Sequence, residues 1–408
     1  MATNLQLKPD KWSAIPLGEV ATFIRGINFK PSDVTKVDTP GSVACMRTKN
    51  VQDNLDFSDI WGVPKKFIKR EDQYLRYGDV LVSSANSWNL VGKCCWIPNL
   101  PWSATFGGFV SVLRADSQKV EPRYLYRWFS SGRLQTTVRS FGRQTTNISN
   151  LDINRCLALP ILLPPIAEQK RIAAILDKAE ELRDLRRKAL GELDAIAQSI
   201  FLEMFGDPVT NPMGWERRVC KSLCSRITVG IVVQPASHYK ESGVPALRSL
   251  NIKENSISLD NLVFFSQIDN ETKLSKTRVK AGDVVLVRTG QPGTAAVIPD
   301  ELDGVNAIDL LITTPLQNMI DSVYLCHFFN SSSGKRLVLS SQVGQIQKHL
   351  NVGILNESPV LLPPLPLQQE FARRVEAIEQ LKTTHRESIA QLDTLFASLQ
   401  HRAFRGEL

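Results

Sequence analysis

LLPPIAEQKR, residues 162–171, and LLPPLPLQQE, residues 361–370, are nearly the same sequence and begin 199 residues apart. Each stretch opens with two leucines and two prolines and continues into a long polar segment with regularly spaced apolar residues. Proline is tolerated in the first turn of a helix, where its missing N–H has no intrahelical partner. Each stretch therefore predicts the start of a helix, and two such junctions predict two equivalent modules.

Further matches extend this repeat along the chain. Trp12 and Trp215 each open a unit, Arg47 aligns with Arg248, and Asn50 aligns with Asn251. The other matched stretches are IRGINF (24–29) with TVGIVV (228–233), CMRTKNV (45–51) with ALRSLNI (246–252), LRYGDVLVSS (75–84) with VKAGDVVLVR (279–288), YLYRWFSSGR (124–133) with YLCHFFNSSSGK (324–335), and SFGRQ (140–144) with QVGQI (342–346). Order and spacing are shared while most other residues differ, which is the signature of an internal duplication.

The repeated stretches also indicate secondary structure. GDVLVSS and GDVVLVR follow Gly-Asp turns and are rich in β-branched residues, which predicts strands, whereas YLYRWFSS and YLCHFFNS predict short helices. We therefore expect two mixed α/β (α+β) domains of roughly 160 residues, each able to bury its own core. The predicted boundaries are a first globular domain over 1–160, a helix over 161–206, a second globular domain over 207–360 and a helix over 361–408.

The two segments after the double prolines predict long coiled-coil helices. Their apolar residues follow a 4–3 spacing, interrupted by Arg186 in the first and by His385 and Ser388 in the second. The stripe residues are Ile175, Ala179, Leu182, Ala189, Leu193, Ile196 and Ile200, then Ile378, Leu381, Leu392, Leu395 and Leu399. Either each stripe packs on its own globular unit, or the two helices pair antiparallel about a pseudo-twofold axis as a rod between the domains. We favour the rod. Pro366-Leu367 replaces Ala167-Glu168, which would shift the start of the second helix by a turn.

Composition bounds the class of protein. Of the 408 residues, 43% are hydrophobic and 22% are charged, which is ordinary for a soluble globular protein. Without an apolar run that could span a bilayer or form the core of a signal peptide, we expect a cytoplasmic protein with no membrane partner. The seven cysteines form no CxxC pair and the five histidines are scattered, so we expect no metal site and read the cysteines as buried thiols in a reducing compartment.

The net charge of +8 is concentrated in one part of the chain. Residues 1–160 contain 21 Lys and Arg against 13 Asp and Glu, whereas the other predicted segments are close to neutral. A basic globular domain is the electrostatic footprint of a protein that binds a polyanion. The first domain is therefore a candidate for nucleic-acid binding.

The motifs of common enzymes are missing from the sequence. There is no GxxxxGK[ST] phosphate loop, Gly107-Gly108 lacks the G-x-G-x-x-G of a dinucleotide fold, and no Asn/Asp-Pro-Pro-aromatic motif of an amino-methyltransferase occurs. Asp152 with Glu168 and Lys170 could be assembled into a nuclease-like set, but the last two are better explained by capping and solvation of a helix start. We predict no catalytic residues.

The combined pattern resembles the DNA-specificity subunit of Type I restriction–modification systems. The resemblance covers essentially the whole chain and rests on the Trp-opened units, the GDV strands, both LLPP junctions with their long helices, and the bridge FGDPVTNPMGW at 205–215. It implies that the two globular units are target-recognition domains, each reading one half of a bipartite double-stranded DNA site, and that the helices set the distance between the half-sites. It also implies no catalysis by this chain.

The resemblance further implies partners. Two modification (methyltransferase) subunits would dock on the helices, and restriction subunits with an ATP-driven translocase could join them. S-adenosylmethionine, Mg²⁺ and ATP would then be bound by these partners and not by this chain. From the helix stripes, we expect docking through Ile175, Leu182, Leu193, Ile378, Leu392 and Leu399.

The resemblance implies that DNA contacts lie in the loops after the GD strands and near the G-x-Q stretches, and Arg47 and Arg248 are further candidates outside these loops. Arg, Asn and Gln side chains can read base edges, whereas Lys more often contacts phosphate. In the first domain the candidates are Arg47, Ser84, Asn86, Ser87, Trp88, Asn89, Lys93, Arg139, Arg143, Gln144, Thr145 and Asn147. In the second domain they are Arg248, Arg288, Thr289, Gln291, Gln345, Gln347, Lys348 and His349.

Two alternatives stay open at this point. The same scaffold could serve as the specificity module of another DNA-modification or phage-defence assembly, with a different enzyme docked on the helices. A stand-alone nuclease or methyltransferase is the alternative from another class, and it would show activity without added partners.

Overall fold

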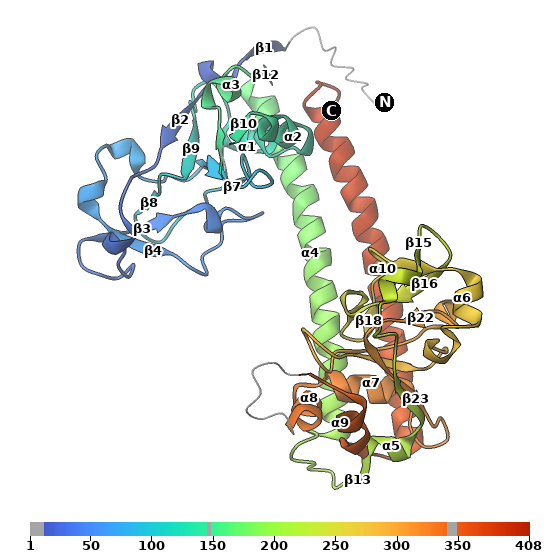
Figure 1. Cartoon of the computed structure of the whole chain (residues 1–408). Coiled ribbons are helices and arrows are strands. Elements are labelled where there is room, and N and C mark those ends of the chain that lie inside the picture. Colours follow the sequence, from blue (N-terminus) through green and yellow to red (C-terminus); the bar gives the residue numbers. More distant parts are fainter. Residues whose placement is uncertain (1–11, 145–147, 341–348) are drawn as a thin grey trace, which may run out of the picture. The chain divides into compact units, whose positions relative to one another are not determined.

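The computed structural model describes residues 12–144, 148–340 and 349–408. It divides into two compact units, the first formed by Met1–Arg187 with Glu387–Leu408 and the second by Lys188–Arg386. Two long helices, α4 (Ile166–Phe205) and α10 (Leu365–Ala403), each contribute residues to both units (Figure 1). Within the described residues no helix is both long enough and apolar enough to cross a lipid bilayer.

The first unit is built around a four-stranded antiparallel sheet in the order β2-β9-β5-β7. A second sheet, β4-β3-β8, a third, β10-β11-β6, and the pair β1-β12 complete it. The strands are β1 (Ser13–Pro16), β2 (Ala21–Arg25), β3 (Ser42–Met46), β4 (Trp61–Pro64), β5 (Val80–Ser83), β6 (Ala85–Asn86), β7 (Cys94–Trp96), β8 (Ala104–Phe106), β9 (Val110–Ala115), β10 (Gly142–Gln144), β11 (Ser149–Leu151) and β12 (Pro160–Leu163). The short helices are α1 (Pro122–Phe129), α2 (Gly132–Ser140) and α3 (Ile153–Leu157).

The second unit repeats this plan with the central sheet β14-β23-β20-β21. The sheet β15-β19-β16-β22 corresponds to β4-β3-β8, and the pair β13-β24 corresponds to β1-β12. The strands are β13 (Glu216–Val219), β14 (Cys224–Val229), β15 (Tyr239–Lys240), β16 (Val244–Leu247), β17 (Ile252–Lys253), β18 (Ser256–Ile257), β19 (Val263–Phe265), β20 (Val284–Val287), β21 (Ala295–Val297), β22 (Asn306–Ala307), β23 (Leu310–Pro315) and β24 (Pro359–Leu362). The short helices are α5 (Cys220–Leu223), α6 (Gln267–Glu271), α7 (Ser322–Asn330), α8 (Ser332–Leu339) and α9 (Val352–Glu357). The predicted duplication is thus confirmed as a shared topology.

A buried glutamine in each LLPP junction joins a long helix to its globular unit. Gln169, 1% exposed, accepts a hydrogen bond from the backbone N–H of Glu121 at 2.8 Å and donates one to the carbonyl of Pro164 at 2.8 Å. Gln368, 0% exposed, accepts from the N–H of Asp321 at 2.8 Å and donates to the carbonyl of Pro363 at 2.7 Å. One amide therefore satisfies a helix-start N–H of the globular unit and a carbonyl of its own proline pair.

A buried tyrosine supports each junction from the side. Tyr124 donates its hydroxyl proton to the carbonyl of Leu162 at 2.8 Å, and Tyr324 does the same to Leu361 at 2.9 Å. Burial raises the pKa of both phenols well above the usual range, so both hydroxyls remain donors. The junction is held on both sides of the prolines, and α4 and α10 begin at equivalent residues. The predicted shift of the second helix start was therefore wrong, because the first turn accommodates Pro366.

The aspartate of each Gly-Asp turn is buried and binds an arginine across the central sheet. Arg114 on β9 binds both carboxylate oxygens of Asp79 at 2.7 Å, and its strand partner on β2 is Thr22. In the second unit the pair is exchanged between strands, since Arg226 on β14 binds Asp283 at 2.7 Å and lies opposite Thr314 on β23. In both units, one guanidinium therefore binds the carboxylate of the Gly-Asp turn.

The long helices run antiparallel within each unit. In the first unit Arg171 of α4 donates to the carbonyl of Leu408, and Arg183, further along α4, binds Asp393 of α10 at 2.6 Å. In the second unit Lys382 of α10 binds Asp194 of α4 at 2.6 Å, and Phe201 of α4 packs against Phe371 near the start of α10. Antiparallel packing of the two helices is confirmed in each unit.

The predicted apolar seam is only partly correct. Ile378, at 6% exposed, and Ala179, at 8%, are buried, but Leu182, Ile196, Leu381 and Leu395 are between 42% and 54% exposed. The seam positions beside them are taken by Arg183 and Lys382, whose alkyl stems pack inward while their charged ends bind aspartates on the facing helix. Outside the predicted stripe, Ile172 and Leu176 of α4 and Phe371 and Val375 of α10 are also buried, in the cores of their globular units.

We predict that Gln368→Ala destabilises the second unit by about 2–4 kcal/mol, because it leaves the N–H of Asp321 and the carbonyl of Pro363 buried without partners. The adjacent Gln369→Ala, at an exposed position, should change the free energy of unfolding by less than about 0.5 kcal/mol. Urea unfolding of the full chain measures both. Equal midpoints for the two variants would contradict the role assigned to Gln368.

We also predict that Arg114→Thr destabilises the first unit by about 3 kcal/mol, since Asp79 is 2% exposed and would lose its cation. The double variant Thr22→Arg/Arg114→Thr copies the strand exchange of the second unit and should recover most of that loss. Thermal unfolding of the single and double variants tests the exchange. The interpretation fails if Thr22→Arg gives no recovery in the Arg114→Thr background.

Candidate nucleic-acid interface

The described parts of the candidate DNA-contact loops lie at one end of the central sheet in each unit. Because β9 is antiparallel to both β2 and β5, the last residues of β2 and β5 lie at the same end as the first residue of β9. Ser83 pairs with Val110 there, and the N–H of Ser83 donates to the carbonyl of Lys93. In the second unit Val287 pairs with Leu310 at the corresponding end. We call these ends the distal end of unit 1 and of unit 2.

A small sheet joins the two candidate loops of the first unit. Asn86 on β6 pairs with Ser149 on β11, and Asn150 on β11 pairs with Arg143 on β10. The loop that follows the GD strand and the loop that contains the G-x-Q stretch are therefore hydrogen-bonded neighbours, although their sequences lie more than 50 residues apart. The sequence predicted both loops separately, and the structure brings them together.

Exposed polar side chains cover this distal end of unit 1. The Arg143 side chain is 80% exposed, and its guanidinium binds Asp152 at 2.5 Å. The backbone N–H of Arg155, followed by Arg143, lowers the pKa of Asp152, so this carboxylate stays charged beside the arginine. Gln144, Ser87, Asn89 and Arg139 are exposed, the last of these in the final turn of α2.

The remaining candidates of unit 1 are held by local contacts. Asn86 donates to Ser83 Oγ at 3.0 Å and accepts from the N–H of Ser87, which fixes its amide orientation. Lys93 donates to Gln52 Oε1 at 2.7 Å. Trp88 is 42% exposed and Ser84 is half-buried. These contacts hold the loop in place, and several of its side chains remain exposed to solvent.

The distal end of unit 2 contains a cluster around Arg288. Its guanidinium donates to Asp309 Oδ1 at 2.6 Å and to His349 Nε2 at 2.8 Å, and its Nε lies 3.4 Å from the Leu350 carbonyl. Arginine has no acceptor, so the imidazole Nε2 accepts this hydrogen bond. Thr289 Oγ1 lies 3.5 Å from Asp309 Oδ2, and Gln291 is exposed. The structure thus brings His349 beside Arg288 and Thr289, although the sequence placed it in a separate stretch.

Arg47 and Arg248 contact their own units. Arg47 binds Asp59 at 2.8 Å, and its guanidinium lies 3.6 Å from the centre of the Trp61 ring. Arg248 donates to the carbonyl of Asn261. The aligned asparagines cap the same turns, because Asn50 and Asn251 accept from the N–H groups of Arg47 and Arg248. These contacts give the alignment of the four residues a structural basis.

Five candidates lie outside the described residues, namely Thr145, Asn147, Gln345, Gln347 and Lys348. Further exposed residues at the distal ends were not predicted from the sequence. Phe109, 62% exposed, precedes β9, and Val233, 76% exposed, follows β14. Asp309 has a left-handed φ of 51° and holds Arg288. An apolar residue in a loop has no distinguishing sequence signal. Asp309 could be recognised only from the structure, where it binds Arg288.

The candidate docking residues occupy different environments on the long helices. Leu182 is 42% exposed, Ile378 is 6% exposed, and Ile175, Leu193, Leu392 and Leu399 are half-buried. Two pairs of exposed apolar residues occupy equivalent positions counted from the two LLPP junctions, Leu182 with Leu381 and Ile196 with Leu395. The two helices therefore share two exposed apolar positions.

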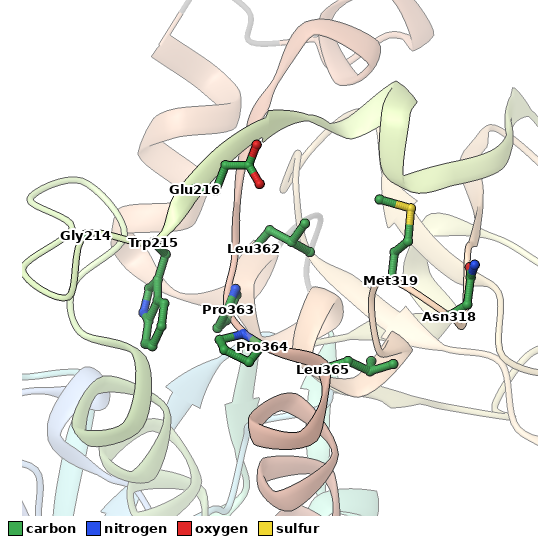
Figure 2. A pocket seen from close by; sticks show the side chains of 9 residues that line it. All are labelled: Gly214, Trp215, Glu216, Asn318, Met319, Leu362, Pro363, Pro364 and Leu365. Atoms are coloured by element: carbon green, nitrogen blue, oxygen red, sulfur yellow. The ribbon is translucent and has the colours of Figure 1, made fainter.

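A cavity of about 420 Å³ opens on the second unit, away from its distal end. Figure 2 shows Trp215 on one side and Met319 on the other, with Pro364 and Leu365 at the start of α10 between them. Met319 follows the last residue of β23, whereas the distal end lies at the first residue of that strand. Within the described ranges, no three His, Cys, Asp or Glu side chains are grouped as a metal site.

Comparison with known proteins identifies the architecture. Residues 9–195 match the family model described as the Type I restriction modification DNA specificity domain. The chain is 24% identical to the Type I restriction enzyme EcoKI specificity subunit of Escherichia coli (strain K12) and 25% identical to the StySPI specificity subunit of Salmonella potsdam. Each alignment covers 98% of this chain and 90% of the relative.

A solved chain of a type I R-M system, studied for its complex assembly and conformational transition, has the same fold. It aligns with a TM-score of 0.58 at 18% identity and covers 97% of this chain and 98% of that chain. The resemblance noted from the sequence is therefore confirmed: over nearly its whole length, this chain is similar to specificity subunits of Type I restriction–modification systems.

Proposed function

We propose that this chain reads a bipartite double-stranded DNA site, with one half-site bound by the distal end of each unit. The observation that carries the proposal is that the two units share their buried contacts, which we call the frame, and differ at their distal ends. The glutamine junctions, the tyrosine supports and the Asp–Arg pairs occur in both units. The distal ends differ, with Arg143 and Gln144 in one and the Arg288 cluster in the other. Two copies of one frame that present different polar groups suit two different base sequences.

Charge and hydrogen-bonding groups support DNA as the ligand. The first 160 residues carry the excess of Lys and Arg, and phosphate contacts supply much of the affinity of a DNA-binding protein. Arg143 and Gln144 are exposed and can reach base edges. Arg288 is already bound to Asp309, so the carboxylate orients a guanidinium that is 14% exposed. We infer that Arg288 has two roles: it positions Thr289 and His349, and it contacts DNA.

In this proposal the helices act as the spacer between the half-sites. Each half-site of a few base pairs gives limited discrimination, at about 1–3 kcal/mol for a good bidentate contact. Linking two readers makes the second binding event intramolecular, which raises its effective concentration. A fixed separation also makes the spacing part of the recognised sequence. The proposal requires α4 and α10 to remain paired, which the Arg183–Asp393 and Lys382–Asp194 ion pairs favour.

We further propose that the helices dock two copies of a modification subunit. Leu182 and Leu381 occupy equivalent positions and stay 42% and 54% exposed, as do Ile196 and Leu395 at 46% and 50%. Apolar groups that recur at equivalent positions suit two copies of one partner surface. Those partners would bind S-adenosylmethionine and transfer the methyl group, and restriction subunits would bring ATP and Mg²⁺. This chain would contribute DNA recognition and no catalytic group.

Mapping of methylated adenines in DNA exposed to the chain with its modification subunit tests the bipartite site. We predict that Arg143→Ala/Gln144→Ala relaxes or removes preference at one half-site only, since both residues lie at the distal end of unit 1. Lys119→Ala is the matched control, because Lys119 is 58% exposed and follows β9 at the opposite end of the same sheet. Loss at both half-sites, or an equal effect of the control, would contradict the assignment.

Docking is tested by the stoichiometry of the complex. We predict that Leu182→Asp and Leu381→Asp each reduce the bound modification subunits from two to one, and that the double variant binds none. A charge on an exposed apolar contact opposes burial in an interface. Gln380→Asp, exposed and adjacent to Leu381, is the control. Native mass spectrometry measures the stoichiometry, and two bound subunits in the double variant would overturn the docking assignment.

A further inference from the structure

We propose that Phe109 makes an apolar contact with a base in the half-site read by unit 1, an inference that rests on the DNA-binding function proposed above. Phe109 lies in the turn before β9 and is 62% exposed. Fully burying a phenylalanine stabilises a protein by about 1.5–3 kcal/mol relative to leaving it exposed. A large ring left in water by its own fold is therefore a candidate for a surface that another molecule covers.

The backbone around Phe109 is held firmly. Its carbonyl accepts hydrogen bonds from the N–H groups of both Ser84 and Ala85 at 3.0 Å. The N–H of Val110 donates to the carbonyl of Gly107 at 3.0 Å, and the N–H of Gly107 donates to Met46 at 2.9 Å. An added Cβ at Gly108 would lie 2.4 Å from Asn28 Oδ1, so a side chain there would require Asn28 to move. The ring is thus presented on a pre-organised turn, which lowers the entropy lost on binding.

The same hydrogen bonds place Phe109 beside the candidate base-reading groups. Ala85, which donates to the Phe109 carbonyl, pairs with Asn150, and Asn150 pairs with Arg143 on β10. A backbone ladder therefore connects Phe109 with the strand that presents Arg143 and Gln144. Polar donors beside an exposed ring match a DNA base, which offers hydrogen-bonding edges together with a thymine methyl group or a stacking face.

Comparison with the second unit indicates that Phe109 serves a function and is not needed for folding. The turn before β23 is one residue shorter, because Ile27 pairs with Gly107 and Ile231 with Ile308, while Ser83 pairs with Val110 and Val287 with Leu310. Asp309 is the one residue between Ile308 and Leu310, so the central sheet of unit 2 forms without an aromatic side chain in this turn. The distal end of unit 2 nevertheless exposes apolar side chains of its own, Val232 at 50% and Val233 at 76%.

The experiment starts from the duplex that the full wild-type chain selects from a random pool. Failure to select any sequence would contradict the proposed function itself and is distinct from the outcomes below. We expect Phe109→Ala to weaken binding to the selected duplex about tenfold or more, to retain wild-type affinity for a scrambled duplex, and to keep the preference at the other half-site. The salt dependence of binding should be unchanged, because no phosphate contact is removed. Phe109→Leu should lose less than Phe109→Ala.

Tyr77→Ala is the matched control, since Tyr77 is 66% exposed and precedes β5 at the opposite end of the same sheet. It should bind the selected duplex like the wild type. Replacing each thymine of the half-site by uracil then locates the contact. A thymine whose methyl group matters to the wild type and not to Phe109→Ala identifies a methyl contact, and a loss without any methyl effect identifies stacking on a base. The proposal is overturned if Phe109→Ala keeps wild-type selectivity, or if it weakens selected and scrambled duplexes equally.

Discussion

The buried glutamine of each LLPP junction is the constraint on which the rest of the structure depends. Two consecutive prolines supply no N–H, so their carbonyls and the neighbouring helix start need partners from elsewhere. Gln169 and Gln368 provide an acceptor for one chain segment and a donor for another in the same place. With the tyrosine hydroxyls on the preceding carbonyls, they fix where each long helix leaves its globular unit. A helix that begins at a fixed residue keeps a fixed position relative to its globular unit, which the proposed docking and spacing both require.

The two units satisfy the same constraints with different residues. The Asp of the GD turn binds an arginine on β9 in the first unit and on β14 in the second. The threonine opposite that arginine lies on β2 in the first unit and on β23 in the second. At the position where Arg127 binds Asp177 of α4, the second unit has His327, buried against Phe371 of α10. Burial lowers the pKa of His327 to about 4, so the imidazole packs as a neutral ring where the first unit uses an ion pair. Geometry is retained while the chemistry of the contact changes.

The sequence was most informative where a residue type is required by geometry. Proline at helix starts, Gly-Asp turns and the paired tryptophans predicted the duplication, the mixed α/β units and the antiparallel helices. It failed for the helix seam, because Arg183 and Lys382 occupy buried positions through their stems and pair with aspartates that lie far away in the sequence. It could not join the two candidate loops, because β6, β11 and β10 are too short to show a strand pattern. Phe109 was missed for a related reason, since exposure of a single aromatic residue is decided by tertiary structure.

The separation of frame from distal end has a physical consequence for how such a protein can change its DNA target. The Asp–Arg pairs and glutamine junctions are buried, and an altered partner there leaves an unpaired charge or amide in the interior. The distal loops are exposed, and the turn that carries Phe109 differs in length between the units without a change in the central sheet. Under the proposed function, substitution in these loops therefore has little effect on folding and changes the groups offered to a base. We infer that recognition can diverge at either unit while the helix starts are retained.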